Sequence, residues 1–478
     1  MTAHKTGPRQ SGRISRRRVL KAGAGAAAAL SARGVLCAAP KPARGMGRPN
    51  VLLIMTDQQH IATISARGCE HVKTPGLDRL CRDGVTFARS HSTNPLCSPA
   101  RSSLWTGRMT SETGVYHNGR PIHSSVPNLG QWFGEKTDYE TIYAGKWHLP
   151  GSFTHKIPGF TVLTPGVGGQ GNLGDISTSL ACEGYLRNRS KDRPFLMIAS
   201  FFQPHDICQW LRLNQHDPGK LRYPELAGEL PALPANFRYD PAEPAPLRRV
   251  RDRNEPGTTK GKWSELHWRY YAWSYYRHIE MVDAEIGRLV AALHDTHHAD
   301  STLVMFTSDH GEGLAHHQMV RKNFLYDESV KVPMIVSLPG RARADAVDTA
   351  HLVSGLDVVP TVCDYAGVAA PPHQRGRSLR GLLEGRAGEW RPYVAAEVGA
   401  GSGAARMIRS DRYKYVTYRG DPVEQLFDMQ ADPGETRNLA KDAQLASVLA
   451  DHRKMLADWQ ARLLPAPDLP KAEHWPTV

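Results

Sequence analysis

Val51-Leu52-Leu53-Ile54-Met55, followed directly by Thr56-Asp57-Gln58, is the stretch of this chain that decides the fold. Its five successive apolar residues leave no polar face, which is typical of a strand in a sheet that is buried on both sides. Three further runs repeat the pattern of a short apolar segment with a polar end, at residues 141–144, 195–202 and 302–308. Stretches with helical spacing lie between them, and this alternation predicts an open α/β sheet.

The longest helical pattern runs from Glu265 to Leu293. Its apolar stripe consists of Leu266, Tyr270, Trp273, Tyr276, Ile279, Val282, Ile286 and Leu289. A stripe with this spacing packs against a core. We therefore expect this helix to cover the sheet rather than to contribute to a functional site.

The four apolar runs end in residues that can carry out chemistry. These residues are Asp57 and Gln58, then Lys146 and His148, then His205, and finally Asp309 and His310. In open α/β sheets, ligands bind beyond the carboxyl ends of the strands. The sequence therefore predicts that these side chains share one site.

A second informative stretch is Cys97-Ser98-Pro99-Ala100-Arg101. A spacing of four places the Cys97 and Arg101 side chains on one face of a helix, and Pro99 suits the first turn. Free backbone N–H groups at a helix start favour anions. The pentapeptide alone is equally compatible with a structural cysteine.

Together with Ser103-Leu104-Trp105-Thr106-Gly107-Arg108, this stretch resembles the signature of the type I sulfatases. Further motifs follow in the order of that family: Gly145-Lys146-Trp147-His148, Pro204-His205, Lys322 ahead of Tyr326, Asp357-Val358-Val359-Pro360-Thr361, and Leu426-Phe427-Asp428. The resemblance covers about residues 49 to 440. It implies an alkaline-phosphatase-like fold, with a mixed, largely parallel central sheet flanked by helices. A smaller C-terminal α+β subdomain would contain an antiparallel sheet.

The resemblance also implies the nucleophile. In type I sulfatases the matching cysteine is oxidised to formylglycine, so Cys97 would be a substrate of a formylglycine-generating enzyme. One hydroxyl of the aldehyde hydrate attacks sulfur, and the other later expels sulfate, which a serine could not do. Arg101 would hold the hydrate, and His148 would orient its hydroxyl and assist deprotonation.

Three further side chains receive roles from the same resemblance. Lys146 would neutralise the sulfate, and His205 would act as general acid for the leaving alcohol. Lys322, rather than its neighbour Arg321, would bind sulfate and help the leaving group. His316, His317 and Glu312 are further candidates for the rim of the substrate site.

The implied metal ligands are Asp57, Gln58, Cys97, Asp309 and His310. The family usually has a second aspartate where this chain has Gln58, whose amide oxygen can still coordinate. Oxygen ligands favour Ca²⁺, while the His310 imidazole leaves Mn²⁺ and Mg²⁺ open. The Asp-Gln and Asp-His pairs resemble the choline-sulfatase and phosphonate-monoester-hydrolase branch.

The N-terminal segment explains most of the positive charge. Residues 1–45 contain ten Lys and Arg and no Asp or Glu, and subtracting these ten from the formal charge of +13 leaves about +3. A net charge this small does not indicate a nucleic-acid partner. Ser15-Arg16-Arg17-Arg18-Val19-Leu20-Lys21 before an Ala/Gly-rich run is typical of a twin-arginine export signal, which predicts a periplasmic or extracellular protein. No later apolar run is long enough to span a membrane.

The rest of the chain divides into two parts. We expect residues 46–385 to form the catalytic domain and residues 386–478 a C-terminal subdomain. In the latter, 393–398, 413–418 and 425–429 look like strands and 438–464 looks helical. Residues 212–262 are rich in proline and charge without clear periodicity, so we expect a long loop at the rim of the active site.

These observations predict an exported sulfuric ester hydrolase that requires a divalent metal. A sulfated carbohydrate is the expected substrate, with aryl sulfates and choline sulfate also open because rim loops set specificity. The main alternative is a phosphodiesterase or phosphonate monoester hydrolase on the same scaffold. A non-catalytic binding module is disfavoured by the full set of catalytic groups.

Overall fold

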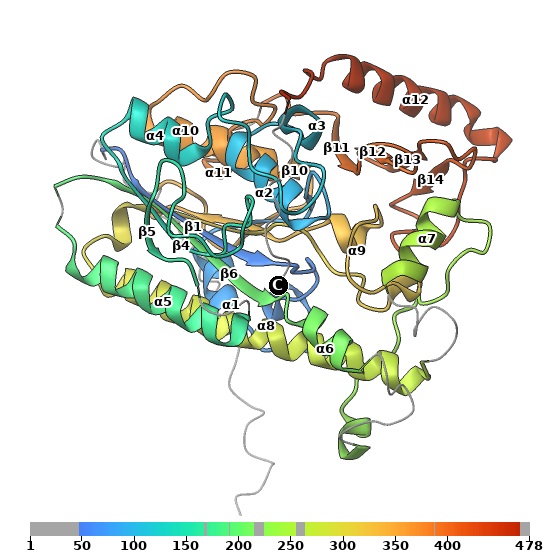
Figure 1. The fold of residues 1–478 in the computed structure, drawn as a ribbon, viewed down its shortest axis with the longest axis horizontal. Helices are drawn as coiled ribbons and strands as arrows, with labels where there is room; N and C mark the ends of the chain where they lie inside the picture. The colour runs from blue at the N-terminus through green and yellow to red at the C-terminus, as the bar shows by residue number, and fades with distance from the viewer. Residues whose placement is uncertain are drawn as a thin grey trace, which may run out of the picture. The chain divides into compact units, whose positions relative to one another are not determined.

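The central sheet has eight strands in the order β5-β4-β6-β1-β7-β8-β2-β9. Figure 1 labels β5, β4, β6 and β1 of this sheet. The strands are β1 (Asn50–Asp57), β2 (Val85–Phe87), β4 (Glu140–Gly145), β5 (Thr161–Thr164), β6 (Phe195–Pro204), β7 (Thr302–Ser308), β8 (Met334–Ser337) and β9 (Ala346–Asp348). Strand β8 runs antiparallel to β7 and β2, and the other pairings are parallel. The expected mixed, largely parallel sheet is confirmed, and the four apolar runs are its adjacent strands β4, β6, β1 and β7.

This computed structural model describes residues 47–166, 170–190, 192–214, 224–254, 263–386 and 388–468. The expected export signal and linker, residues 1–45, lie outside the described residues. Among the described helices, none combines the length and apolarity that a membrane span requires.

Strand β1 shows why its apolar run has no polar face. Val51, Leu53 and Met55 pack into the core on one side of the sheet, while Leu52 and Ile54 pack into the core on the other side. Because successive side chains of a strand point to opposite faces, a strand between two helical layers needs an apolar residue at every position.

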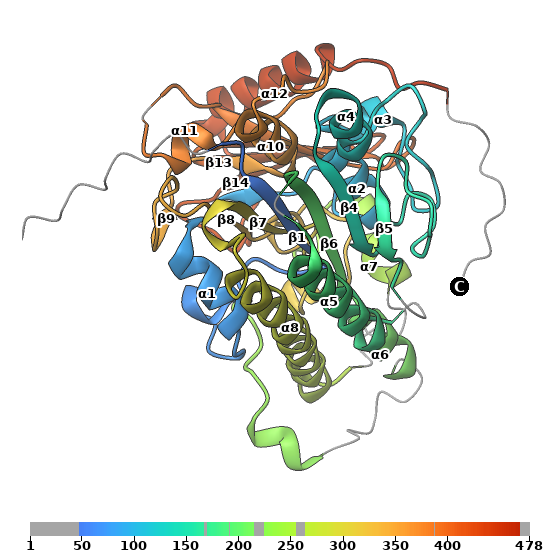
Figure 2. The same cartoon turned by 90° about the vertical axis from the view of Figure 1, so that its left-hand side faces the viewer.

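Helices cover both faces of the sheet. Figure 2 shows α5 (Gly171–Asn188) and α8 (Glu265–His294) side by side on one face, with α1 (Pro75–Asp83) next to α8. The core on the opposite face includes residues of α2 (Cys97–Thr106), α4 (Leu129–Lys136) and α10 (Val358–Ala366). The helix expected from Glu265 to Leu293 is confirmed, and it ends one residue later.

The C-terminal region contains a four-stranded antiparallel sheet, as expected. Its strands are β11 (Tyr393–Val398), β12 (Ala405–Ser410), β13 (Tyr413–Tyr418) and β14 (Gln425–Asp428), followed by α12 (Ala446–Ala461). Strand β12 was not expected, and α12 begins eight residues later than the predicted Asn438. The side chain of Asn438 accepts hydrogen bonds from the backbone of Leu426 and Ala440, which ties this segment to β14 instead of a helix.

The expectation of a long irregular loop at 212–262 is wrong for part of that range. Helix α6 (Ile207–Asn214) extends into it, and α7 (Ala245–Asn254) lies within it. Leu247 of α7 is buried in an apolar cluster that contains Phe324 and Phe427, and Arg251 forms a buried ion pair with Glu243. These tertiary contacts stabilise a helix whose charged sequence has no clear apolar stripe.

The remaining elements are short. They are the two-stranded pair β3 (Ser90–His91) and β10 (Val353–Ser354), and the helices α3 (Thr110–Thr113), α9 (Asp327–Val330) and α11 (Arg380–Leu383).

Candidate active site

Two aspartates meet where the parallel strands β1 and β7 end. Asp57 is the last residue of β1, Asp309 directly follows β7, and both side chains are buried. Asp309 Oδ1 accepts hydrogen bonds from the backbone N–H of Gln58 at 3.0 Å and of His310 at 2.9 Å. The sheet register therefore brings residues 252 positions apart in sequence to one point, as the strand-end pattern predicted.

Arg101 joins the two carboxylates. Its Nε donates to Asp309 Oδ2 at 2.9 Å, and its Nη2 donates to Asp57 Oδ2 at 3.0 Å. Its Nη1 donates to the carbonyl oxygen of Lys146 at 2.7 Å and to Ser200 Oγ at 2.9 Å. Fully buried and bonded to four acceptors, this guanidinium fixes the orientation of both aspartates.

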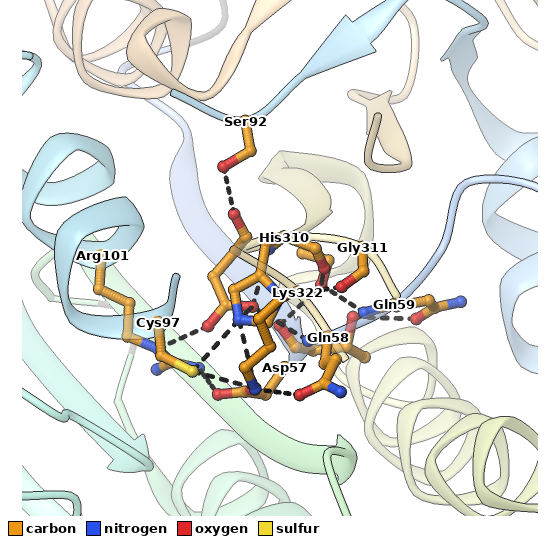
Figure 3. A network of polar contacts seen from close by, with 12 residues as sticks. Asp57, Gln58, Gln59, Ser92, Cys97, Arg101, His310, Gly311 and Lys322 are labelled. Carbon is orange, nitrogen blue, oxygen red and sulfur yellow. Dashed lines mark hydrogen bonds and ion pairs between the residues drawn. The ribbon is translucent and has the colours of Figure 1, made fainter. Parts of the chain in front are cut away.

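Cys97 is the first residue of α2, and its side chain is buried against the aspartates. Its Sγ lies 3.6 Å from Asp57 Oδ1 and 3.2 Å from His310 Nε2. Because Arg101 also contacts Asp57, the expectation that Cys97 and Arg101 share one face of a helix is confirmed (Figure 3).

The possible ligand atoms of Asp57, Cys97, Asp309 and His310 lie within 4.8 Å of one another. Arg101 binds the Oδ2 atoms of both aspartates, and the Oδ1 atoms face Cys97 and His310. Two carboxylate oxygens and an imidazole form a donor set that suits a divalent cation.

Lys146, at the carboxyl end of β4, adds a third charge to this cluster. Its Nζ lies 2.7 Å from Asp57 Oδ2 and 5.2 Å from the centre of the Phe202 ring. Burial acts to raise the pKa of Asp57, but the positive charges of Lys146, Arg101 and Lys322 hold that pKa well below its usual range. Asp57 is therefore an ionised carboxylate.

Gln58 has a different partner at each end of its amide group. Its Oε1 accepts a hydrogen bond from Lys322 Nζ, and its Nε2 donates to Glu312 Oε2. Glu312 Oε1 in turn accepts from the Tyr271 hydroxyl and the Arg321 backbone N–H. An aspartate at position 58 could not donate to Glu312 and would repel it, which explains why this chain departs from the two-aspartate pattern.

His148 and His205 lie close enough to the cluster for its charges to act on them. Burial, together with the charges of Lys146 and Arg101, holds the pKa of His148 well below its usual value. Burial, Lys146 and Lys322 do the same for His205. A bound sulfate, being an anion, acts to raise the pKa of both rings, as the proton donor of the reaction requires. The buried Nδ1 of His148 has no hydrogen-bond partner in the described part of the chain.

The rim expected at His316, His317 and Glu312 is not observed. Glu312 is buried behind Gln58, and His317 is buried with its ring stacked on Tyr326 at 3.9 Å. His316 is half-buried and lies 3.1 Å from Glu328. These three residues lie in a segment that is rich in glycine and polar residues, a composition that is typical of an exposed loop. In the structure this segment packs under α7 and α8 through Leu314 and Met319.

Sequence reasoning missed two kinds of residue that support the site. Ser200, inside β6, both accepts from Arg101 and donates to the Lys146 carbonyl at 2.7 Å. On α8, Tyr271 and Tyr275 point inward, and the Tyr275 hydroxyl donates to the Gln58 carbonyl at 2.7 Å. The predicted stripe selected their neighbours, so it did not include the two tyrosines of α8 that support the site.

We expect Ser200→Ala to lower kcat/KM about 10-fold, because Arg101 and the Lys146 carbonyl would each lose a hydrogen-bond partner. Loss of such supporting contacts typically lowers activity about 10- to 100-fold. Ser177→Ala is the matched control, since the Ser177 hydroxyl donates to the Gly174 carbonyl within α5. Steady-state kinetics of the two variants test this. Equal activities would show that Ser200 does not hold Arg101 in place.

Comparison with known proteins agrees with this geometry. The family model described as Sulfatase matches residues 49–368, and the model described as N-sulphoglucosamine sulphohydrolase, C-terminal, matches residues 315–462. The Delta 4,5-hexuronate-2-O-sulfatase of Bacteroides thetaiotaomicron is 34% identical over 447 residues, which cover 89% of this chain and 91% of that protein.

Two solved structures are similar to this chain over most of its length. The structure of a 2-O GAG sulfatase is 32% identical, with a TM-score of 0.77, over 87% of this chain and 92% of that one. The phosphonate monoester hydrolase of Agrobacterium radiobacter is 25% identical, with a TM-score of 0.69, over 87% of this chain and 96% of that one. The resemblance read from the sequence motifs is confirmed.

Proposed function

Because this chain belongs to the sulfatase family and is a sulfuric ester hydrolase, we propose that it removes a 2-O-sulfate from a hexuronate in a sulfated carbohydrate. The observation that carries the chemistry is the position of Cys97, at the start of α2 and between two carboxylates and an imidazole. The substrate class is supported by the relative that is 34% identical along nearly the whole chain.

The proposed nucleophile is formylglycine made from Cys97, with a divalent cation beside it. The cation would be held by the Asp57 and Asp309 carboxylates, the Gln58 amide oxygen, the His310 imidazole and the matured Cys97; Ca²⁺ is favoured by the oxygen donors. When bound, such a cation lowers the pKa of an attacking hydroxyl and offsets charge on sulfate oxygens.

Three buried cations give the site its positive charge. Arg101, Lys146 and Lys322 surround Cys97 and face two carboxylates, Asp57 and Asp309, so the side chains alone leave a net charge of +1. A site with excess positive charge and preorganised donors stabilises an anionic sulfate and its transition state. We assign Lys146 and Lys322 to the sulfate oxygens and Arg101 to the matured Cys97.

A substrate comparison tests this proposal. The purified protein would be assayed with a 2-O-sulfated uronate disaccharide, a 6-O-sulfated glucosamine, choline sulfate, nitrophenyl sulfate, a phosphodiester and a phosphonate monoester. We expect the highest kcat/KM for the 2-O-sulfated uronate. A higher value for choline sulfate or for the phosphonate monoester would refute the substrate assignment, and the second result would favour the main alternative.

The twin-arginine pattern supports a proposed export of this enzyme to the periplasm or beyond. Replacing Arg16 and Arg17 by lysine should retain the protein in the cytoplasm, as cell fractionation would show. Unchanged export of the double variant would contradict this proposal.

We expect His205→Ala to affect esters with poor leaving groups far more than activated ones. A general acid contributes about 10²- to 10⁴-fold when the leaving alcohol needs a proton, so the loss should reach at least about 10²-fold for a sugar sulfate and stay small for nitrophenyl sulfate. Lys146→Ala should slow both, because Lys146 is assigned to the sulfate that they share. Equal losses on both esters for His205→Ala would show that His205 is not the acid.

A further inference from the structure

A cavity of about 1030 Å³ opens beside the catalytic cluster. Lys322, which donates to Gln58, forms part of its wall, and so does Leu96, the residue before Cys97. The other walls come from α7 and from residues 398–405, which connect β11 to β12. Since ligand pockets typically measure about 300–1,000 Å³, this space is large enough for more than the sulfate group.

One arginine in this cavity differs from its neighbours on α7. Arg248 donates to the Glu243 carbonyl, and Arg251 forms a buried ion pair with the Glu243 carboxylate. Arg249 lines the cavity, is exposed, and makes no ion pair with any described residue. The unpaired guanidinium of Arg249 therefore faces the same space as Lys322.

The opposite wall of the cavity lies close to the guanidinium of Arg249. A Cβ atom built on Gly403 would lie 3.6 Å from Arg249 Nη2, so the guanidinium lies against the backbone of the β11–β12 connection. Gly403 has a φ of 79°, in the left-handed region that favours glycine. A Cβ atom at 3.6 Å would be in ordinary contact with Arg249, so the backbone conformation, rather than the space, favours glycine at position 403.

The rest of the cavity suits an anionic sugar. Arg321 adds a second guanidinium next to Lys322, and Asp252 supplies a carboxylate that can accept from sugar hydroxyls. Tyr116 and Phe324 provide aromatic surface for the apolar face of a ring. Positive side chains outnumber Asp252, so a negatively charged substituent is favoured here.

We propose that Arg249 binds the carboxylate of a uronic acid whose sulfate lies at Cys97, and so selects uronates over neutral sugars. This inference rests on the proposed function, and it deepens that function by naming the residue that recognises the sugar. Arginine pairs with a carboxylate through two parallel N–H···O bonds, a geometry that a neutral hydroxymethyl group cannot provide.

The test compares two substrates that differ in one charge. Wild type, Arg249→Gln and Arg248→Gln would be assayed on a 2-O-sulfated uronate disaccharide and on its carboxyl methyl ester. Hydrogen bonds to charged groups correspond to about 10- to 100-fold in affinity. We expect the preference of wild type for the acid over the ester to fall by about that factor in Arg249→Gln, mainly through KM. Arg248→Gln, which changes an exposed arginine on the same helix, should keep the wild-type ratio.

Two results would overturn the inference. If Arg249→Gln keeps the wild-type ratio of kcat/KM for the acid to kcat/KM for the ester, then Arg249 does not bind the carboxylate. Cleavage of the uronate by wild type would still support the proposed function in that case. If wild type cleaves no sulfated uronate but hydrolyses another sulfate ester, then the proposed substrate and this inference both fail. Thermal melting of the variants verifies folding, which replacement of the exposed Arg249 should not disturb.

Discussion

Replacing Cys97 by alanine is expected to lower kcat by about 10⁶-fold, the scale seen when a covalent nucleophile is removed. Cys97 is the only cysteine in the described chain whose Sγ lies within 3.6 Å of Asp57 and 3.2 Å of His310. Although burial and Asp57 oppose ionisation, Lys322, Lys146 and His310 lower the pKa of its thiol. Those same charges would stabilise the ionised nucleophile that matures from this residue.

Two measurements accompany this prediction. Mass spectrometry of the peptide that contains Cys97 should show an aldehyde in place of the thiol, and kinetics should show the loss in Cys97→Ala. Cys182→Ala is a matched control: this cysteine is also buried, but burial in an apolar core raises its pKa to about 12. It should lower stability without lowering kcat. A fully active protein with an unmodified Cys97 thiol would refute the mechanism.

The sequence was sufficient to predict the central sheet and the place of the site. In β1 the apolar residues fill every position because helices cover both faces, and that pattern is visible without a structure. Asp57 and Asp309 could be brought together because strands that end in polar residues share one edge of a parallel sheet. Long-range register did not have to be known for this step, only the direction of the strands.

The contacts that support the site could not be predicted from the sequence. They depend on how a helix is rotated about its axis and on how strands are aligned, and no local sequence pattern encodes either. Tyr276 belongs to the predicted apolar stripe of α8, but it is the neighbouring residue, Tyr275, that donates a hydrogen bond to the Gln58 carbonyl. Ser200 lies inside an apolar strand and looks like a small core residue until Arg101 is placed beside it. Helix α7 depends on tertiary partners such as Phe427, far away in sequence.

The departure from the family pattern at Gln58 has a physical reason. Gln58 both accepts from Lys322 and donates to Glu312, so the amide lets a cation and a carboxylate lie on either side of it. A buried carboxylate at position 58 would face Glu312 without a donor between them, and buried charges are costly unless they are paired. The choice of glutamine therefore follows from its surroundings, which sequence motifs do not show.

Asp309→Asn is expected to release the metal and to lower kcat by about 10⁴-fold, because a catalytic cation contributes several kcal/mol to transition-state stabilisation. Asparagine keeps the size of the side chain, but it removes the negative charge that both the cation and Arg101 require. It also replaces one carboxylate oxygen with an NH₂ group, which cannot accept a hydrogen bond. Because Asp309 accepts hydrogen bonds from Arg101, Gln58 and His310, at least one of these bonds would be lost. Elemental analysis and kinetics of the purified variant measure both effects.

The control for this prediction is Asp175→Asn. Asp175 is equally buried, and its carboxylate accepts from the backbone N–H groups of Phe202 at 2.6 Å and Gln203 at 2.9 Å. Burial raises the pKa of Asp175 to about 8, which disfavours its charged form, so an amide changes the charge less at this position than at Asp309. Asp175→Asn should therefore keep its metal. Full metal occupancy in Asp309→Asn would mean that the Asp309 carboxylate is not a ligand and that its role is to hold Arg101. Metal loss in both variants would mean that the loss is not specific to position 309 and would withdraw the support for Asp309 as a ligand.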